Sequence, residues 1–421
     1  MPLQSHIEFS TDGKVISTIK ALNGIKILNF STHIAGSYAS MLMADMGAEI
    51  IRVDLPFQSE SNLDGIDTGH QIWEQWNRGQ RSLELDYTHK TGFEALKRLI
   101  EVSDVLIEDW LPGEAKSLYL DFESVQGINP KLLYCAMPPF GESGPLSDIA
   151  ADNGVVSTIA GIYGDQGGED SPPMYVKIPF ASYGTSFLAS FAITSALFER
   201  ETSGMGQKIE VPLYFGAIAM RPTFTIVTKK DSSFHSQAPT ALSNSQQIRN
   251  PVYGLYECSD GWIFVAAGNE AFWKKFCSAI KKPELAKDKR FFGAPWNIPT
   301  ENQGLLHEII KPVFKEKSKS YWLNELADAD VPSSPALNRS DFLNHPQVIH
   351  NEILAENINP KIDSTHQFGI PIKMSKTPGE IGSPMGIKSE NTWEILNSLG
   401  FTRDEMISMS KCKVIPTQKD K

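Results

Sequence analysis

Side chains that could do chemistry are sparse, and few stand at the spacing that a known kind of site requires. Cys135, Cys258, Cys277 and Cys412 form no CxxC pair, which argues against a structural zinc site and against a disulfide framework. We expect these thiols to be reduced and mostly buried. Ser182 carries a hydroxyl but has no matched base in the surrounding sequence, and no metal is expected.

The first strand-to-helix turn is a place where a nucleotide could bind, but its residues argue against a dinucleotide. Asp54 ends a predicted strand, where dinucleotide folds carry an acid that binds the ribose. The preceding turn, STHIAG at 31–36, lacks the GxGxxG pattern that brings backbone N–H groups against a pyrophosphate. The absence argues against a nicotinamide dinucleotide.

Alternating strands and helices position these residues. The pattern predicts strands at 25–30, 49–53, 105–108 and 132–137 with helices at 37–46 and 91–102, and therefore a parallel sheet covered by helices. A Gly/Pro-rich stretch at 138–173 precedes a long predicted helix at 183–201, which ends at Gly204 and Gly206.

The character of the chain changes after residue 225. The segments 252–258 and 262–267 flank Ser259-Asp260-Gly261 and predict a hairpin, followed by helices at 270–280 and 302–314. We therefore expect a large domain from 1–225, a smaller α+β domain at 226–335, and a segment at 336–421 that returns to the large domain.

Composition excludes several classes of protein. The net charge of −11 would repel a polyphosphate backbone, so nucleic-acid binding is not expected. No run of eighteen apolar residues and no signal peptide is found in the 421 residues, which predicts a cytoplasmic protein that does not bind a membrane.

An ordered series of segments resembles one family, the class III CoA-transferases. The resemblance covers roughly residues 22 to 400, and the segments that carry it are LNGIKILNFSTHIAGSYASMLMADMGAEIIRVDLP, NRGQRSLELD, DVLIEDWLPGEA, INPKLLYCAMPPFGESGP, FERETSGMGQKIEVPLY, GLYECSDGWIFVAAGNEAFWKKFC and DVPSSPALNRSDFLNHPQV. Formyl-CoA transferase and carnitine CoA-transferase belong to this family, and 2-methylacyl-CoA racemases are close relatives.

The resemblance implies a fold and a reaction. The fold is a Rossmann-like α/β large domain with a smaller domain, in two chains threaded through each other as interlocked rings. The family moves CoA from one carboxylic acid to another. An aspartate attacks the acyl thioester to form a mixed anhydride and then an enzyme-bound CoA thioester, from which the acceptor acid takes the CoA.

The resemblance implies that the family's catalytic aspartate is replaced in this chain. Counting back without a gap from the block FLASFAITSALFERETSGMGQ places Ser182, preceded by Ala181, at its position on the approach to the long helix. An acyl-serine is an ordinary ester and does not activate an acyl group as an anhydride does. The racemase reading also lacks a residue, because the histidine that precedes Asp152 in those enzymes is Ala151 here.

The resemblance also assigns a CoA site, and several of its residues depart from the family pattern. Leu55 replaces a basic residue, Gln80 a lysine and Asp109 an asparagine, which depletes the cationic character of the site. His33 and Arg81 have structural alternatives, the first as a partner of local backbone and the second in an ion pair with Asp86 or Glu84. The predicted CoA contacts are His33, Ala35, Leu55, Gln80, Arg81, Asp109, Trp110 and the turn at Gly268 and Asn269. That turn matches a mobile loop of the family, or it is simply a tight turn before a helix.

Three functions remain open. In the first, which we favour, the chain is the subunit without aspartate in a heteromeric CoA-transferase, and a paralogous partner supplies the aspartate. Succinyl-CoA:benzylsuccinate CoA-transferase, a two-gene member of the family, could be built in this way. Alternatively, the chain is a homodimeric enzyme that uses Ser182, or a binding protein that has kept the fold and lost the reaction. In each case the ligands are CoA, a small carboxylic acid and its CoA thioester.

Overall fold

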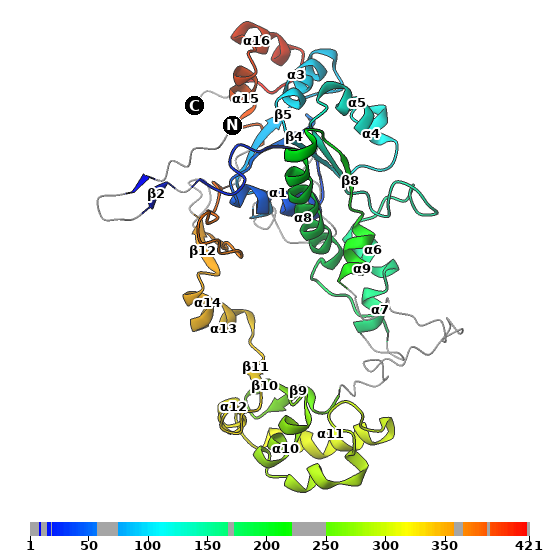
Figure 1. Ribbon diagram of the computed structural model, residues 1–421, viewed down its shortest axis with the longest axis vertical. Coiled ribbons are helices and arrows are strands. Elements are labelled where there is room, and N and C mark those ends of the chain that lie inside the picture. The colour runs from blue at the N-terminus through cyan, green and yellow to red at the C-terminus, as the bar shows by residue number, and fades with distance from the viewer. Residues whose placement is uncertain are drawn as a thin grey trace. The chain divides into compact units, whose positions relative to one another are not determined.

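The computed structural model describes residues 8–9, 15–17, 19–56, 75–166, 172–220, 250–357, 365–384 and 388–418 (Figure 1). The chain divides into two compact units. The larger contains Met1–Ile162, Val176–Ile226 and Glu352–Lys421, and the smaller contains Tyr163–Tyr175 and Val227–Asn351. No described helix is both long enough and apolar enough to cross a bilayer.

A parallel sheet forms the centre of the larger unit and confirms the predicted fold class. Its strands are β3 (Lys26–Asn29), β4 (Glu49–Asp54), β5 (Gln80–Glu84), β6 (Val105–Glu108), β7 (Leu133–Ala136) and β8 (Lys208–Glu210), in the order β5-β4-β3-β6-β7-β8. This is the strand order of dinucleotide-binding folds. All the strands are parallel, and the order in which the chain adds them to the sheet reverses between β3 and β6. The strands β5 and β8 were not predicted, because they are short and polar and lie at the two edges of the sheet.

Helices cover both faces of the sheet. One face packs against α3 (Lys90–Glu101), α5 (Phe122–Ile128), α15 (Thr392–Ser398) and α16 (Arg403–Lys411), which share one hydrophobic cluster with the strands (Figure 1). The segment around α15 also protects the edge strand β5. The side chains of Asn391 and Thr392 accept hydrogen bonds from the backbone N–H groups of Ser82 and Glu84, at 3.0 Å each, so these donors are not left open to another chain.

The opposite face carries α1 (Ile34–Asp45) and α8 (Phe180–Ser203), and α9 (Leu213–Ala219) packs against α8. Every residue of α1 is buried. Glycine permits α8 and α9 to approach each other closely: a Cβ on Gly184 would lie 2.4 Å from the carbonyl oxygen of Gly216.

The predicted start of the long helix was wrong. We expected residue 183, but α8 begins at Phe180, directly after Pro179. Proline cannot continue a hydrogen-bonded turn before it, and the residues that follow it are free to adopt helical geometry. Ser182 therefore lies within the first turn of α8 and not on the approach to it.

The smaller unit has its own antiparallel sheet, β11-β10-β9, and its own hydrophobic cluster. The hairpin prediction is confirmed, because β9 (Tyr253–Cys258) pairs with β10 (Gly261–Ala266) across the predicted turn. The third strand is β11 (Ser333–Pro335), and the helices are α10 (Glu270–Ala279), α11 (Thr300–Lys315), α12 (Lys319–Asp328), α13 (Arg339–Leu343) and α14 (Pro346–His350), with 3-10 turns η3 (Pro283–Lys287) and η4 (Lys289–Phe291).

The remaining elements are short. The pair β1 (Glu8–Phe9) and β2 (Val15–Ser17) stands in the leader that we expected to be irregular. The strands β12 (Leu354–Asn357) and β13 (Thr365–Phe368) form an antiparallel pair in the larger unit. The other helices are α4 (Glu114–Ser117), α6 (Asn153–Ile159) and α7 (Ile162–Gln166).

Candidate functional site

The carboxyl ends of β3 and β6 form the candidate site. In open parallel sheets, ligands bind where the strand order reverses, and the order here reverses between these two strands. Several predicted CoA contacts follow strands at this edge: His33 follows β3, Leu55 follows β4, and Asp109 and Trp110 follow β6. Ala35 lies in the first turn of α1. The sheet therefore brings these five residues to one side of the molecule.

The turn between β3 and α1 is held by side chains of the chain itself. The backbone N–H groups of Thr32 and His33 both donate to Asp109 Oδ2, each at 2.8 Å. The backbone N–H and the hydroxyl of Ser31 donate to Asn29 Oδ1, at 3.0 and 2.5 Å. These bonds fix the start of α1, at which His33 is the N-cap residue without a side-chain capping bond.

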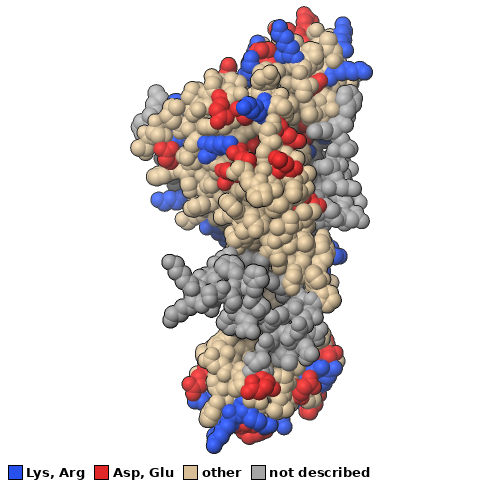
Figure 2. Space-filling view, turned by 90° about the vertical axis from the view of Figure 1, so that its right-hand side faces the viewer, with Lys and Arg blue, Asp and Glu red and all other residues tan. Residues whose placement is uncertain are grey.

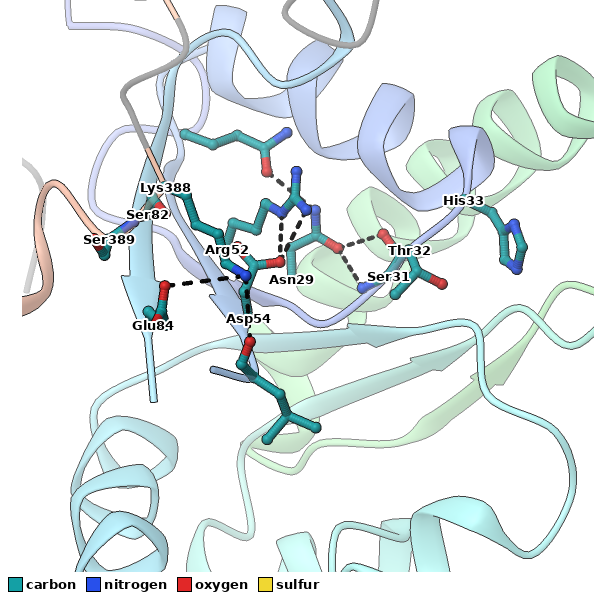
Figure 3. A network of polar contacts seen from close by, with 12 residues as sticks. Asn29, Ser31, Thr32, His33, Arg52, Asp54, Ser82, Glu84, Lys388 and Ser389 are labelled. Carbon is teal, nitrogen blue, oxygen red and sulfur yellow. Dashed lines mark hydrogen bonds and ion pairs between the residues drawn. The ribbon is translucent and has the colours of Figure 1, made fainter. Parts of the chain in front are cut away.

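Charged groups beside this turn pair with one another (Figure 3). Arg52 donates through Nε and Nη2 to Asp54 Oδ1, at 3.0 and 2.9 Å. Lys388 Nζ lies 4.0 Å from Glu84 and 3.4 Å from the carbonyl oxygen of Leu55. The strand-end acid Asp54 is thus neutralised within the chain, and Leu55 contributes its backbone to the network while its side chain packs against the hydrophobic cluster.

Glu108 is a buried acid at the end of β6. Its side chain is 4% exposed and accepts a hydrogen bond from the backbone N–H of Trp110 at 2.6 Å, and its Oε1 lies 3.2 Å from the hydroxyl of Tyr134. Burial raises the pKa of Glu108 to about 8, and the nearby charge of Asp109 adds to this effect. The Trp110 ring stacks obliquely against Phe30, at 5.4 Å between ring centroids.

We expect Glu108→Gln to remove part of the pH dependence of stability. The folded-state pKa of about 8 lies above the ordinary value of 4.5, so the stabilisation from the protonated acid is complete below pH 4.5 and is lost as the pH rises to 8. Glutamine can keep both contacts without titrating. We would measure the free energy of unfolding of both proteins at pH 5 and pH 8. Between these two pH values, the stability of the variant relative to the wild type should rise by roughly a few kcal/mol. The exposed Glu101→Gln is the control, and an equal pH response of both variants would contradict the assignment.

Gln80 and Arg81 begin β5 and take structural roles. Gln80 accepts from Asn29 Nδ2 at 3.0 Å and donates to the carbonyl oxygens of Ser37 and Trp76, at 3.3 Å each, so it braces α1 against the sheet. Arg81 pairs with Glu49 at 2.6 Å and with Glu394 at 3.1 Å. These partners differ from Asp86 and Glu84, which we had named as the structural alternative. Both residues stand at the amino end of their strand, away from the carboxyl edge.

Ser182 is fully buried in the first turn of α8, with an exposed fraction of 0%. Its backbone N–H, which has no partner within the helix at this position, donates to Asn153 Oδ1 at 3.1 Å. Its carbonyl oxygen lies 2.8 Å from Ser186 Oγ, which is also 2.8 Å from the carbonyl oxygen of Ala35. Ser186 therefore links the first turns of α8 and α1, and Ser182 lies within packed protein.

The racemase reading gains no support from this region. Asp152 is the N-cap residue of α6, and its Oδ1 accepts from the backbone N–H of Val155 at 2.9 Å. The carboxylate is therefore used in capping, beside Ala151, which has no proton to exchange. Within the described residues, no group of three His, Cys, Asp or Glu side chains is arranged to hold a metal ion.

Gly268 and Asn269 lie in the smaller unit, at the start of α10. Asn269 is the N-cap residue, and its side chain accepts from the backbone N–H of Phe272 at 2.8 Å. The carbonyl oxygen of Gly268 accepts from Trp296 Nε1 at 2.8 Å. Locally, the pair therefore forms the tight turn before a helix that we named as the structural alternative.

Sequence reasoning missed four polar residues that organise the site: Asn29, Arg52, Asn153 and Glu108. Two of them left a signal, since Asn29 is a lone amide in the apolar strand IKILNF and Arg52 interrupts EIIRV. A polar side chain inside a buried strand requires a partner. The identity of each partner depends on strand pairing, which the sequence does not show.

Comparison with known proteins gives a consistent result. The model of CoA-transferase family III matches residues 22–385. Human succinyl-CoA:glutarate CoA-transferase is 25% identical over 391 residues, covering 91% of this chain and 87% of the relative. Succinyl-CoA:mesaconate CoA-transferase of Haloarcula hispanica is 27% identical over 394 residues, covering 90% and 96%. The crystal structure of a CAIB/BAIF family protein from Brucella suis is 26% identical, with a TM-score of 0.75 and coverage of 91% and 100%.

Proposed function

The chain belongs to CoA-transferase family III, and from this membership we propose that it is the non-catalytic subunit of a heteromeric CoA-transferase. In this proposal a paralogous partner chain supplies the nucleophilic aspartate, and the assembly transfers CoA between two carboxylic acids. The proposal rests on Ser182, which we assign to the position of that aspartate by counting along the sequence and which is fully buried.

The chemistry of Ser182 supports a lost nucleophile. The start of a helix as long as α8 favours a negative charge, so the position suits the carboxylate that the family reaction needs. A hydroxyl there is uncharged at neutral pH and requires a base to become a nucleophile. The described contacts of Ser182 are instead structural: its backbone binds Asn153 and approaches Ser186.

The candidate CoA site also supports the proposal. The phosphates of CoA need cationic partners, but Arg52 is already paired with Asp54, and Arg81 with Glu49 and Glu394. Acidic groups are numerous at the carboxyl edge of the sheet. The strands β4, β5 and β6 end in Asp54, Glu84 and Glu108, and Asp109 follows β6. We infer that the partner chain provides most of the binding energy for CoA.

An exposed apolar stripe on α8 supports a partner chain. Phe187, Phe191 and Phe198 follow one another at helical spacing, and the last two are 72% and 81% exposed. Phe215 of the adjacent α9 and Ile159 of α6 are also exposed. Figure 2 shows a broad area without Lys, Arg, Asp or Glu on this side of the larger unit. Apolar surface of this kind marks contact with another protein, and we propose the interlocked family dimer as that contact.

Co-expression tests the proposal. We expect the chain alone to be poorly soluble or to form a weak homodimer, because the apolar stripe then lacks its proper cover. With a paralogue that carries aspartate after alanine at this position, it should form a stable one-to-one complex with CoA-transferase activity, measured by size-exclusion chromatography and by an acyl-CoA exchange assay.

The same experiment separates the other functions. A stable homodimer that transfers CoA by itself would contradict the heteromer and favour chemistry through Ser182. A stable chain that binds no paralogue and transfers no CoA would favour a binding protein. The matched control is Phe198→Ser with Phe191→Ser, which should weaken assembly with the paralogue while leaving the buried core unchanged.

A further inference from the structure

The start of α1 is a place where folds of this strand order bind anions. Backbone N–H groups at the first turn of a helix are unpaired and carry partial positive charge, so they attract phosphates and carboxylates. In this chain the relevant donors lie at the reversal between β3 and β6. They are the backbone N–H groups of Thr32 and His33, which precede the 12 residues of α1.

A carboxylate of the chain itself already occupies these donors. Asp109 Oδ2 accepts from both N–H groups at 2.8 Å, and Asp109 Oδ1 lies 3.4 Å from Thr32 Oγ1. Asp109 is only 7% exposed, so the carboxylate is fixed and poorly accessible to water. Charge-assisted bonds of this length are stronger than bonds to a neutral acceptor, and an external anion would have to displace them against repulsion.

The space beside Gly36 is filled as well, so within the described part of the chain the only room for an anion at these donors is the volume that the Asp109 carboxylate now occupies. In dinucleotide folds a glycine near this turn lets the phosphate approach the backbone. Gly36 is the third residue of α1, and a Cβ placed on it would meet Ser31 Oγ at 2.1 Å. Ser31 is buried and bonded to Asn29, so its hydroxyl takes up the space that glycine would leave.

We propose that Asp109 is a built-in anion that closes the switch-point site of this chain. The carboxylate holds the donors of Thr32 and His33, and external phosphates and carboxylates are excluded from the start of α1. Removal of the Asp109 carboxylate opens a site for one small anion at the same two donors. The inference goes beyond the proposed function, because it concerns this chain alone and holds with or without a catalytic partner.

Chemical rescue tests the inference on the assembly that the full chain forms on purification. Asp109→Ala should lower the melting temperature by several degrees, and formate or inorganic phosphate should restore at least half of the loss in a saturable manner at constant ionic strength. The wild type should show only the general salt effect. The control Asp152→Ala removes a capping carboxylate from the less buried start of α6 and should not be rescued saturably.

A second variant guards against misfolding of Asp109→Ala. Asp109→Asn keeps an oxygen that accepts both N–H bonds but removes the negative charge. In calorimetric titration with inorganic phosphate, affinity should rise from the wild type to Asp109→Asn and again to Asp109→Ala. The inference is overturned if the wild type binds phosphate as tightly as Asp109→Asn, or if a folded Asp109→Ala protein shows no saturable rescue. Neither outcome depends on the catalytic partner, so each is distinct from failure of the heteromer.

Discussion

Ser182→Ala should leave CoA transfer by the assembled complex within about twofold of the wild-type rate, since no bond is made or broken at a residue that fills space. The same assembly should lose transfer by on the order of 10³-fold or more when the partner's aspartate is replaced by alanine, because the loss of a covalent nucleophile removes the whole anhydride route. Steady-state acyl-CoA exchange measures both variants.

The burial of Ser182 is the reason for this contrast. Ser182 is fully buried, and its backbone N–H donates to Asn153 of α6, so a thioester would have to displace structure to reach the hydroxyl. If the hydroxyl were the nucleophile, the pattern would reverse. Ser182→Ala would then abolish transfer, and mass spectrometry after incubation with acyl-CoA would detect an acyl group on the peptide that contains Ser182.

Ser182→Asp extends the test to the rest of the site. A carboxylate at a fully buried position is costly unless partners neutralise it, and the chain offers Leu55, Gln80 and Asp109 where basic or neutral CoA contacts are expected. We therefore expect a loss of stability and no second transferase site. A full gain of activity by the chain without a competent partner site would show that its CoA site is intact.

Arg78→Met should lower the free energy of unfolding by about 3–5 kcal/mol, because it leaves a buried carboxylate without its counter-ion. Arg78 and Asp45 are both fully buried, and Arg78 Nη2 donates to Asp45 Oδ2 at 2.6 Å. Burial raises the pKa of Asp45 even though the Arg78 bond opposes the shift. Arg78 also donates to the carbonyl oxygen of Phe368, so it ties β13 to the end of α1.

Urea denaturation with two controls isolates the buried charge. Arg81→Met removes the partly exposed pairs with Glu49 and Glu394 and should cost no more than about 1 kcal/mol. The double variant Arg78→Met with Asp45→Leu removes both buried charges and should recover most of the loss. Equal costs for Arg78→Met and Arg81→Met would contradict the role of the buried pair.

Some residues of the candidate site could be placed from the sequence, and others could not. His33, Ala35, Leu55, Asp109 and Trp110 reach one edge of the sheet as the alternation of strands and helices predicts, because parallel strands present their carboxyl ends together. Gln80 and Arg81 were assigned to the same site, yet they begin an edge strand too polar for its period to be recognised. Apart from the carbonyl oxygen of Trp76, the side-chain partners of Gln80 and Arg81 lie at least 32 residues away in the chain, beyond any local pattern.

By itself, the sequence determined the family, through an ordered series of segments that resemble it, and the parallel α/β architecture, through local patterns of apolar spacing. Only the tertiary structure decided how each polar group is used. It placed Ser182 inside the first turn of α8, joined Arg78 to Asp45, and set Asp109 on the donors of Thr32 and His33. Such pairings depend on which strands and helices become neighbours, since burial without a partner costs free energy that only distant parts of the chain can offset.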